Sequence, residues 1–192
     1  MGRPSVKEQL VDRTRGVWLE RGFEGASVHD LVTAAGVPKG SFYNHFPSKE
    51  HFAVEHVHRY VRTLQLEALR DAPGSAVDAV REHFEHQIAA RQEGRMDAGC
   101  LLGTFSNSVT DSYPALRAAV RHGFEQWIEA LTAVLSRACA AGEIPATSEP
   151  ADLAAALVDG FEGAIARTRA TGLADPLRVF VTVTLAEFTR RP

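Results

Sequence analysis

The segment AAGVPKGSFYNHFPSKE, residues 34–50, decides how the N-terminal part of the chain folds. Gly36 predicts the end of one helix, because glycine readily adopts the left-handed conformation that closes a helix. Pro38 suits the first turn of the next helix, where its missing N–H costs nothing. Phe42 and Phe46 lie four residues apart, so they share one face of that short helix. The segment therefore predicts two short helices joined by a tight turn, which is a helix-turn-helix arrangement.

Helical patterns continue on both sides of this segment. Apolar residues recur at helical spacing over residues 6–23, and Gly22 is expected to stop this first helix. Ser27, with Asp30 three residues later, predicts the capped start of a second helix. Further helices are expected over residues 49–72, 75–92, 98–109, 113–141, 151–171 and 176–190. The sequence shows no sustained strand alternation, so we expect an all-α fold of about nine helices.

Composition and charge are ordinary for a globular protein. The 192 residues are 45% hydrophobic and 23% charged. The sequence has no apolar run of about 20 residues and no signal-peptide pattern at its N-terminus, so we expect a cytoplasmic protein with no membrane partner. Two cysteines do not make a disulfide framework. Residues 1–50 carry 7 Lys and Arg against 6 Asp and Glu, whereas residues 51–192 carry 14 against 18, which places the less acidic end at the helix-turn-helix.

The outer face of the third expected helix carries polar side chains that suit DNA. A helix enters the major groove readily, and its exposed residues then contact phosphates or base edges. Tyr43 and His45 offer donors to phosphate oxygens, and Lys49 adds a positive charge at the start of the next helix. Lys39 and Asn44 can meet base edges. From periodicity alone, a solvated face of a small helical bundle is the alternative.

Residues 23–50 resemble the DNA-binding module of the TetR/AcrR family of bacterial transcriptional regulators. The matching elements are Gly22-Phe23, Ser27-Val28, Ala35-Gly36-Val37, Gly40, Phe42-Tyr43, His45-Phe46 and Ser48-Lys49-Glu50. The resemblance implies a DNA-binding domain over residues 1–50 and a helical effector-binding and dimerisation domain over residues 51–192. It also implies that bases are met by Lys39, Gly40, Ser41 and Asn44, and that phosphates are held by Tyr43, His45 and Lys49. Ser27 would approach the DNA backbone as well.

Some positions depart from the family pattern. Arg13 and Thr14 stand where small alanines are usual in the first helix, and Gly16 interrupts that helix. Asn44 replaces a frequent aromatic residue or histidine, which changes the operator that is read. We also hypothesise that Arg3 reaches into a neighbouring minor groove, as basic arms do; a disordered terminus is the alternative.

The C-terminal part suggests several candidate ligand sites. The stretch GCLLGTFSNSV resembles a subgroup with regulators that respond to electrophiles through a cysteine, and Cys100 occupies the matching place; burial as a small residue is the alternative. Phe84, Phe105, Phe124 and Trp127 are expected to line a pocket or to fill the core. We expect His56, His58, His83 and His86 to lie on solvated helix surface, because no metal-binding spacing links them. No metal or other cofactor is expected.

The last two expected helices carry a small-residue and apolar pattern that predicts a four-helix dimer interface, as the resemblance also implies. Its residues are Leu153, Ala156, Leu157, Gly160, Phe161, Ala164, Leu177, Phe180, Val181, Thr184 and Phe188; a bundle face within one chain is the alternative. The sequence has no assembled nucleophile and base, so we expect no enzyme. The leading hypothesis is a homodimeric repressor of a palindromic double-stranded DNA operator, released by a small-molecule effector. The alternatives are an electrophile-sensing or redox-sensing repressor acting through Cys100 and a helical small-molecule-binding protein or enzyme.

Overall fold

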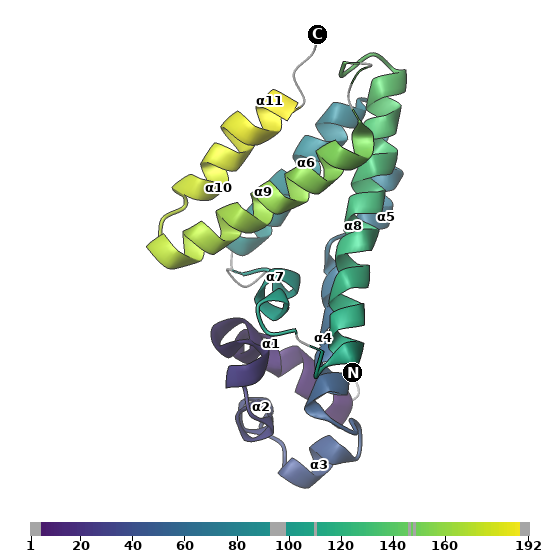
Figure 1. Cartoon of the computed structure of the whole chain (residues 1–192). Coiled ribbons are helices and arrows are strands. Elements are labelled where there is room, and N and C mark those ends of the chain that lie inside the picture. Colours follow the sequence, from purple (N-terminus) through teal and green to yellow (C-terminus); the bar gives the residue numbers. More distant parts are fainter. Residues whose placement is uncertain (1–4, 93–98, 110, 146, 148, 189–192) are drawn as a thin grey trace. The chain divides into compact units, whose positions relative to one another are not determined.

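The computed structural model describes residues 5–92, 99–109, 111–145, 147 and 149–188, without the side chains of residues 92 and 188. Every regular element in these ranges is helical, which confirms the all-α fold (Figure 1). The elements are α1 (Val6–Gly25), α2 (Val28–Ala35), α3 (Lys39–Tyr43), α4 (Lys49–Thr63), α5 (Leu66–Arg70), α6 (Ala76–Gln92), α7 (Leu101–Ser106), α8 (Pro114–Ala140), α9 (Pro150–Thr171), α10 (Asp175–Val179), the π-helical segment η1 (Phe180–Leu185) and α11 (Ala186–Phe188). Within the described ranges, no helix is both long enough and apolar enough to cross a membrane.

The chain divides into two compact units. The N-terminal unit contains Met1–Thr63 and Cys100–Gly123, and the C-terminal unit contains Leu64–Gly99 and Phe124–Pro192. Helix α8 therefore begins in the first unit and continues into the second. The division of the chain at residue 50 into DNA-binding and effector domains stays a prediction.

Some expected helix boundaries differ from the structure. The expected end of the first helix at Gly22 is supported, because Gly22 has non-helical φ 69° and ψ −178°, and only a short helical stretch to Gly25 follows this kink within α1. Gly16, which was expected to interrupt the first helix, lies within it without a break. Gln65 has a left-handed φ of 55°, which divides the single helix expected over residues 49–72 into α4 and α5. The amide of buried Gln87 donates to the Leu64 carbonyl (3.4 Å), so the break is satisfied by a distant side chain that local sequence patterns do not reveal.

Aromatic side chains fill the N-terminal unit. The ring of buried Trp18 lies 6.0 Å from that of Phe23, 5.9 Å from that of Phe52 and 5.4 Å from that of Phe105. These rings come from α1, α4 and α7, so three helices distant in sequence meet at one point. Burying each such side chain is worth about 1.5–3 kcal/mol. The cluster therefore fixes the base on which α2 and α3 rest.

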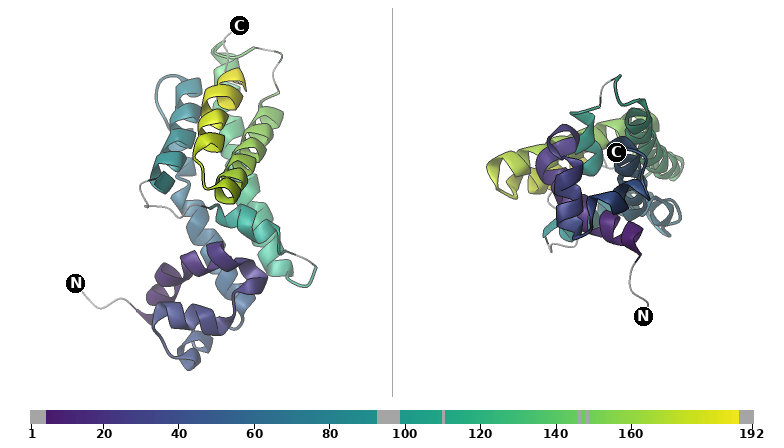
Figure 2. Two further views of the ribbon diagram at one scale, coloured as in Figure 1. Left: turned by 90° about the vertical axis from the view of Figure 1, so that its left-hand side faces the viewer. Right: turned by 90° about the horizontal axis from the view of Figure 1, so that it is seen from below.

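A second aromatic cluster fills the C-terminal unit. The rings of Phe84, Phe161 and Phe180 lie 5.0–5.2 Å apart, and that of Trp127 lies 5.9 Å from Phe161. All four are almost completely buried. Helix α9 packs against α10 and η1 (Figure 1; Figure 2, left view), and the rings of Phe161 on α9 and Phe180 on η1 lie 5.2 Å apart.

Glu50, near the start of α4, holds the start of α8. Its Oε1 accepts hydrogen bonds from the backbone N–H groups of Ala115 (2.8 Å) and Leu116 (3.0 Å). The first N–H groups of a helix have no partner inside the helix, and a carboxylate there is favoured by the helix dipole. Glu50 thus supplies a cap for α8 from another part of the sequence.

We predict that Glu50→Ala lowers the free energy of unfolding by about 0.5–2 kcal/mol, the usual cost of a lost helix cap. Urea unfolding followed by circular dichroism measures the change. Glu50→Gln, which keeps an acceptor oxygen, should lose less. Glu20→Ala is the matched control because Glu20 is an exposed carboxylate of the same unit. An equal loss in both alanine variants would contradict the capping role.

Candidate nucleic-acid interface

The turn between α2 and α3 is built on Gly36. This residue has φ 69° and ψ 36°, and its N–H bonds to the Thr33 carbonyl while the Val37 N–H bonds to the Val32 carbonyl, each at 3.1 Å. A residue with a Cβ adopts this left-handed conformation only with strain. The Arg13 Nη1 donates to the Ala35 carbonyl (3.1 Å) and satisfies a further group at this helix end. Arg13, which departs from the family pattern, therefore ties α1 to the turn.

The start of α2 is fixed by a capping box, as its sequence predicts. The Ser27 Oγ accepts from the Asp30 N–H (3.1 Å), and the Ser27 N–H donates to Asp30 Oδ2 (2.9 Å). Hydrogen bonds from Ser27 lower the pKa of Asp30 to about 2, with a smaller contribution from Arg21, whose Nη1 lies 2.7 Å from Asp30 Oδ1. Ser27 itself is exposed and remains accessible to a ligand.

Helix α3 is anchored by two phenylalanines. Phe42 is fully buried and Phe46 is 5% exposed, and their rings lie 5.3 Å and 4.6 Å from the ring of Phe52 on α4. Both side chains are buried, although α3 ends at Tyr43 and Phe46 therefore lies beyond its last helical residue. Because the helix has only five residues, its position depends on this packing rather than on its own hydrogen bonds.

The opposite face of α3 is largely exposed. Lys39, Gly40, Asn44 and His45 are exposed and Ser41 is half-buried, while Tyr43 is 53% exposed. Their side chains form no hydrogen bond with any described residue, and residues 31–49 contain no Asp or Glu. This surface, which we call the α3 face, therefore offers hydroxyl, amide, imidazole and ammonium groups without a nearby carboxylate from its own segment. Such groups match phosphate oxygens and base edges.

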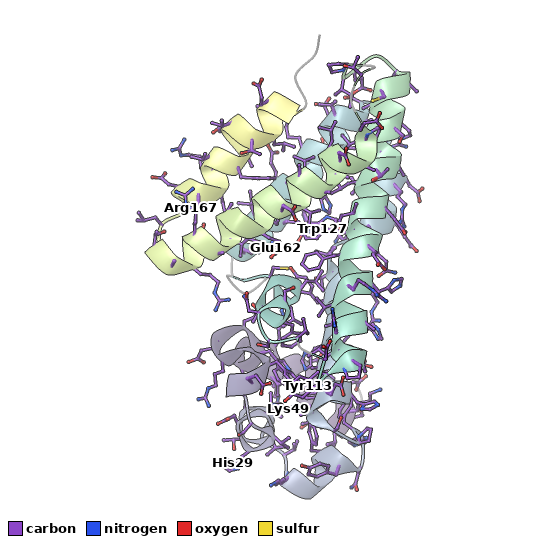
Figure 3. All side chains as sticks on the ribbon, in the orientation of Figure 1. His29, Lys49, Tyr113, Trp127, Glu162 and Arg167 are labelled. Carbon is purple, nitrogen blue, oxygen red and sulfur yellow. The ribbon has the colours of Figure 1, made fainter. Side chains whose placement is uncertain are left out.

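Lys49 has a different setting. Its Nζ donates to the Phe23 carbonyl (2.9 Å) and lies 4.4 Å from the centre of the Phe23 ring, which also packs against Tyr113 at 4.6 Å (Figure 3). The ammonium group thus joins α4 to the end of α1. Its phosphate contact stays a prediction, and the structure adds a stabilising role that the family pattern did not indicate.

Two histidines that we expected on solvated surface are buried, so that prediction is wrong for them. His56 is 3% exposed, and its Nε2 lies 3.0 Å from the Oγ1 of buried Thr14, which itself donates to the Leu10 carbonyl. His83 is 8% exposed and accepts a hydrogen bond from Trp127. Burial lowers the pKa of His56 to about 3 and that of His83 to about 4. A polar partner buried with each histidine, invisible in local spacing, explains the difference; Thr14 is one of the family departures.

The other expected site residues lie as follows. Phe105 packs on Trp18 and Phe23 in the N-terminal unit, whereas Phe84 and Trp127 lie in the aromatic core of the C-terminal unit and Phe124 is half-buried there. Cys100 forms no disulfide with a described residue, is 2% exposed and lies immediately before α7. Arg3 lies outside the described residues.

The expected dimer residues divide into two groups. Leu157, Phe161, Ala164, Leu177 and Phe180 are already buried within the single chain. Partly accessible positions are Leu153, Ala156, Gly160, Val181 and Thr184, and the side chain of Phe188 lies outside the described residues. Val179 and Val183, which are not among the expected dimer residues, are 38% and 59% exposed and lie four residues apart.

The capped α2, the glycine turn and the anchored α3 with its polar outer face define a helix-turn-helix DNA-binding protein. Comparisons with known proteins identify its family. Residues 10–55 match the model of bacterial regulatory proteins of the tetR family, and residues 76–184 match that of the tetracyclin repressor-like C-terminal domain. The chain belongs to the TetR family and is a DNA-binding transcriptional regulator.

Individual relatives are similar along most of their length. The HTH-type transcriptional repressor DhaR of Mycobacterium sp. (strain GP1) is 34% identical over 95% of this chain and 92% of its own. The transcriptional regulator AcuR of Cereibacter sphaeroides is 32% identical over 84% of this chain and 75% of its own. The crystal structure of the reduced form of Escherichia coli NemR superposes with a TM-score of 0.84 at 26% identity, covering 97% of this chain and 98% of that one.

The different settings of Lys39 and Lys49 lead to a prediction. Lys39→Ala should leave the melting temperature unchanged and weaken binding to the operator more than binding to shuffled DNA, because Lys39 is exposed and is assigned to a base edge. Lys49→Ala should lower the melting temperature, because it removes the bond to Phe23. Thermal melts and DNA titrations of both variants distinguish the two roles. A large loss of stability in Lys39→Ala would contradict the assignment.

Proposed function

We propose that this protein is a repressor that binds a palindromic operator as a homodimer through the α3 face and is released by a small-molecule effector. The observation that carries the proposal is the α3 face itself, with exposed Tyr43, Lys39 and Asn44 on a helix whose other side is locked by Phe42 and Phe46. Similarity to DhaR and to NemR of Escherichia coli, which are both transcriptional repressors, supports repression rather than activation.

Within this proposal the exposed residues divide by task. Lys39, Gly40, Ser41 and Asn44 face base edges, because they are short or flexible and Gly40 allows close approach of the backbone. Tyr43, His45 and Ser27 contact phosphates and fix the register of α3 in the groove. Fluorescence anisotropy with DNA from the protein's own upstream region, against shuffled DNA at several salt concentrations, tests the proposal. Preferential binding with a steep salt slope supports it, and equal binding to both DNAs counts against it.

We predict that Asn44→Ala weakens binding to the operator by about 1–3 kcal/mol and weakens binding to shuffled DNA less, because a base contact carries sequence information. Tyr43→Ala should weaken binding to both DNAs alike, since it removes a phosphate contact. The same anisotropy titration measures both variants. Equal losses for Asn44→Ala on operator and shuffled DNA would show that this residue does not read a base.

The homodimer would pair the exposed side of α9 and the α10–η1 segment with a second copy. Val179 and Val183 give this surface apolar area, and the exposed small residues Gly163, Ala166 and Ala170 let a second helix approach. Two copies of α3 are needed because half-sites of a palindrome repeat about every 34–36 Å along one face of DNA.

We predict that Val183→Asp shifts the protein from dimer to monomer, because a carboxylate would be buried at the contact without a partner. Sedimentation velocity across a concentration series measures the shift. Ala133→Asp, which places the same charge at an exposed position of α8, is the matched control and should leave the dimer intact. A Val183→Asp variant that remains as dimeric as the control would place the interface elsewhere.

Effector release requires a ligand site in the C-terminal unit. Two hollows in this unit are candidates for that site. One has a volume of about 430 Å³ and lies beside Arg91, Thr168 and Leu177, and the other has a volume of about 170 Å³ and lies between α5 and α6. Sensing through Cys100 is the alternative, and the burial of that thiol gives it no particular support. Helix α8 contains residues of both units. A ligand that displaces α8 would therefore also displace the start of this helix, which is capped by Glu50.

A further inference from the structure

The hollow between α5 and α6 combines an apolar floor with one polar ring. Leu64, Leu69 and Ala79 are buried at its floor beside His83, and exposed Glu82 and His86 lie at its rim. Its volume of about 170 Å³ is several times the roughly 30 Å³ of one water molecule, but below the 300–1,000 Å³ usual for drug-sized ligands. The space therefore suits a small molecule.

The tautomer of His83 follows from its partner. The Trp127 Nε1–H, which can only donate, lies 2.9 Å from His83 Nε2, so this nitrogen must be the acceptor. A neutral imidazole whose Nε2 accepts carries its proton on Nδ1. Burial keeps the ring neutral at ordinary pH by lowering its pKa to about 4. Trp127 thereby fixes His83 as an Nδ1–H donor.

The Nδ1–H donor has no hydrogen-bond partner among the described residues, because the bond to Trp127 uses Nε2. The His83 ring also makes edge contacts with the rings of Phe84 and Trp127. Nδ1 is not one of the completely enclosed polar atoms, so an acceptor placed in the hollow can meet it. The ring is more than nine-tenths buried and lines the hollow, so a ligand there can satisfy it.

We propose that the hollow between α5 and α6 binds a small uncharged molecule that has a carbonyl or similar acceptor oxygen and an apolar body, with His83 Nδ1–H donating to the oxygen. An anion is disfavoured, because the carboxylate of Glu82 lies at the rim and none of the described residues that line this hollow is Lys or Arg. The apolar body contacts Leu64, Leu69 and Ala79. This inference deepens the proposed function and rests on it for the claim that the ligand is an effector. A ligand bound to His83 would alter the hydrogen bond between His83 and Trp127, which lies on α8 (Figure 3).

The test uses cyclohexanone as the probe, with methylenecyclohexane as a matched ring that lacks the acceptor oxygen. The intact protein, labelled with ¹⁵N, is titrated without DNA, and the side-chain signals of His83 and Trp127 are followed. We expect a protonated Nδ1 in the free protein, saturable shifts of both signals with cyclohexanone, and at least about tenfold weaker binding of methylenecyclohexane, the factor that corresponds to about 1.4 kcal/mol.

His83→Phe keeps a ring in the core but removes the donor, so it should abolish the preference for cyclohexanone; His58→Phe, at an exposed position, should keep it. If His83→Phe does not fold, the position of the proton on the His83 ring of the unchanged protein still tests the proposal. A protonated Nε2, equal affinity for the two rings, or no saturable shift with cyclohexanone would overturn the proposal. Saturable binding at His83 that leaves DNA affinity unchanged would support the site while counting against its role as the effector site, so the two failures are distinguishable.

Discussion

A helix of five residues is too short to keep its shape in water by its own hydrogen bonds, so α3 depends on the burial of Phe42 and Phe46. Both rings pack on Phe52, which belongs to the same aromatic cluster as Trp18 and Phe105. One side of α3 is therefore held rigidly, and this lets the other side present polar groups in a defined array. The pairing of aromatic and polar residues in residues 34–50 is the direct expression of that constraint.

Polar side chains further stabilise the N-terminal unit by bonding to the ends of its helices. Arg13 holds the end of α2, Lys49 joins α4 to the end of α1, and Glu50 caps α8. Each side chain satisfies backbone groups that a helix end leaves without partners. The adjacent Lys49 and Glu50 thus bond to two different helices of the N-terminal unit. Lys49 and Glu50, which match the family pattern, therefore stabilise the N-terminal unit in addition to any contact that Lys49 makes with DNA.

Much of this could be predicted from the sequence, because it depends on neighbouring residues. The capping box at Ser27, the left-handed Gly36 and the inward Phe42 and Phe46 are all encoded within four or five positions. The break at Gln65, the burial of His56 and His83, and the structural bond of Lys49 were missed, because each depends on a partner 23 to 44 residues away. The dependence on distant partners also limits the prediction of the dimer interface. A periodic apolar pattern indicates that one face of a helix is buried, but it does not show whether that face packs against the same chain or against a second copy.

The central claim is that the α3 face reads DNA sequence. The most direct test selects binding sites from a pool of random duplexes, in parallel for the unchanged protein and for a variant with Lys39, Ser41 and Asn44 all replaced by Ala. We predict a palindromic motif for the unchanged protein, and a loss of preference at the same positions in both half-sites for the variant, whose fold is preserved because these residues are not buried. The same motif from both proteins, or none from either, would contradict the claim.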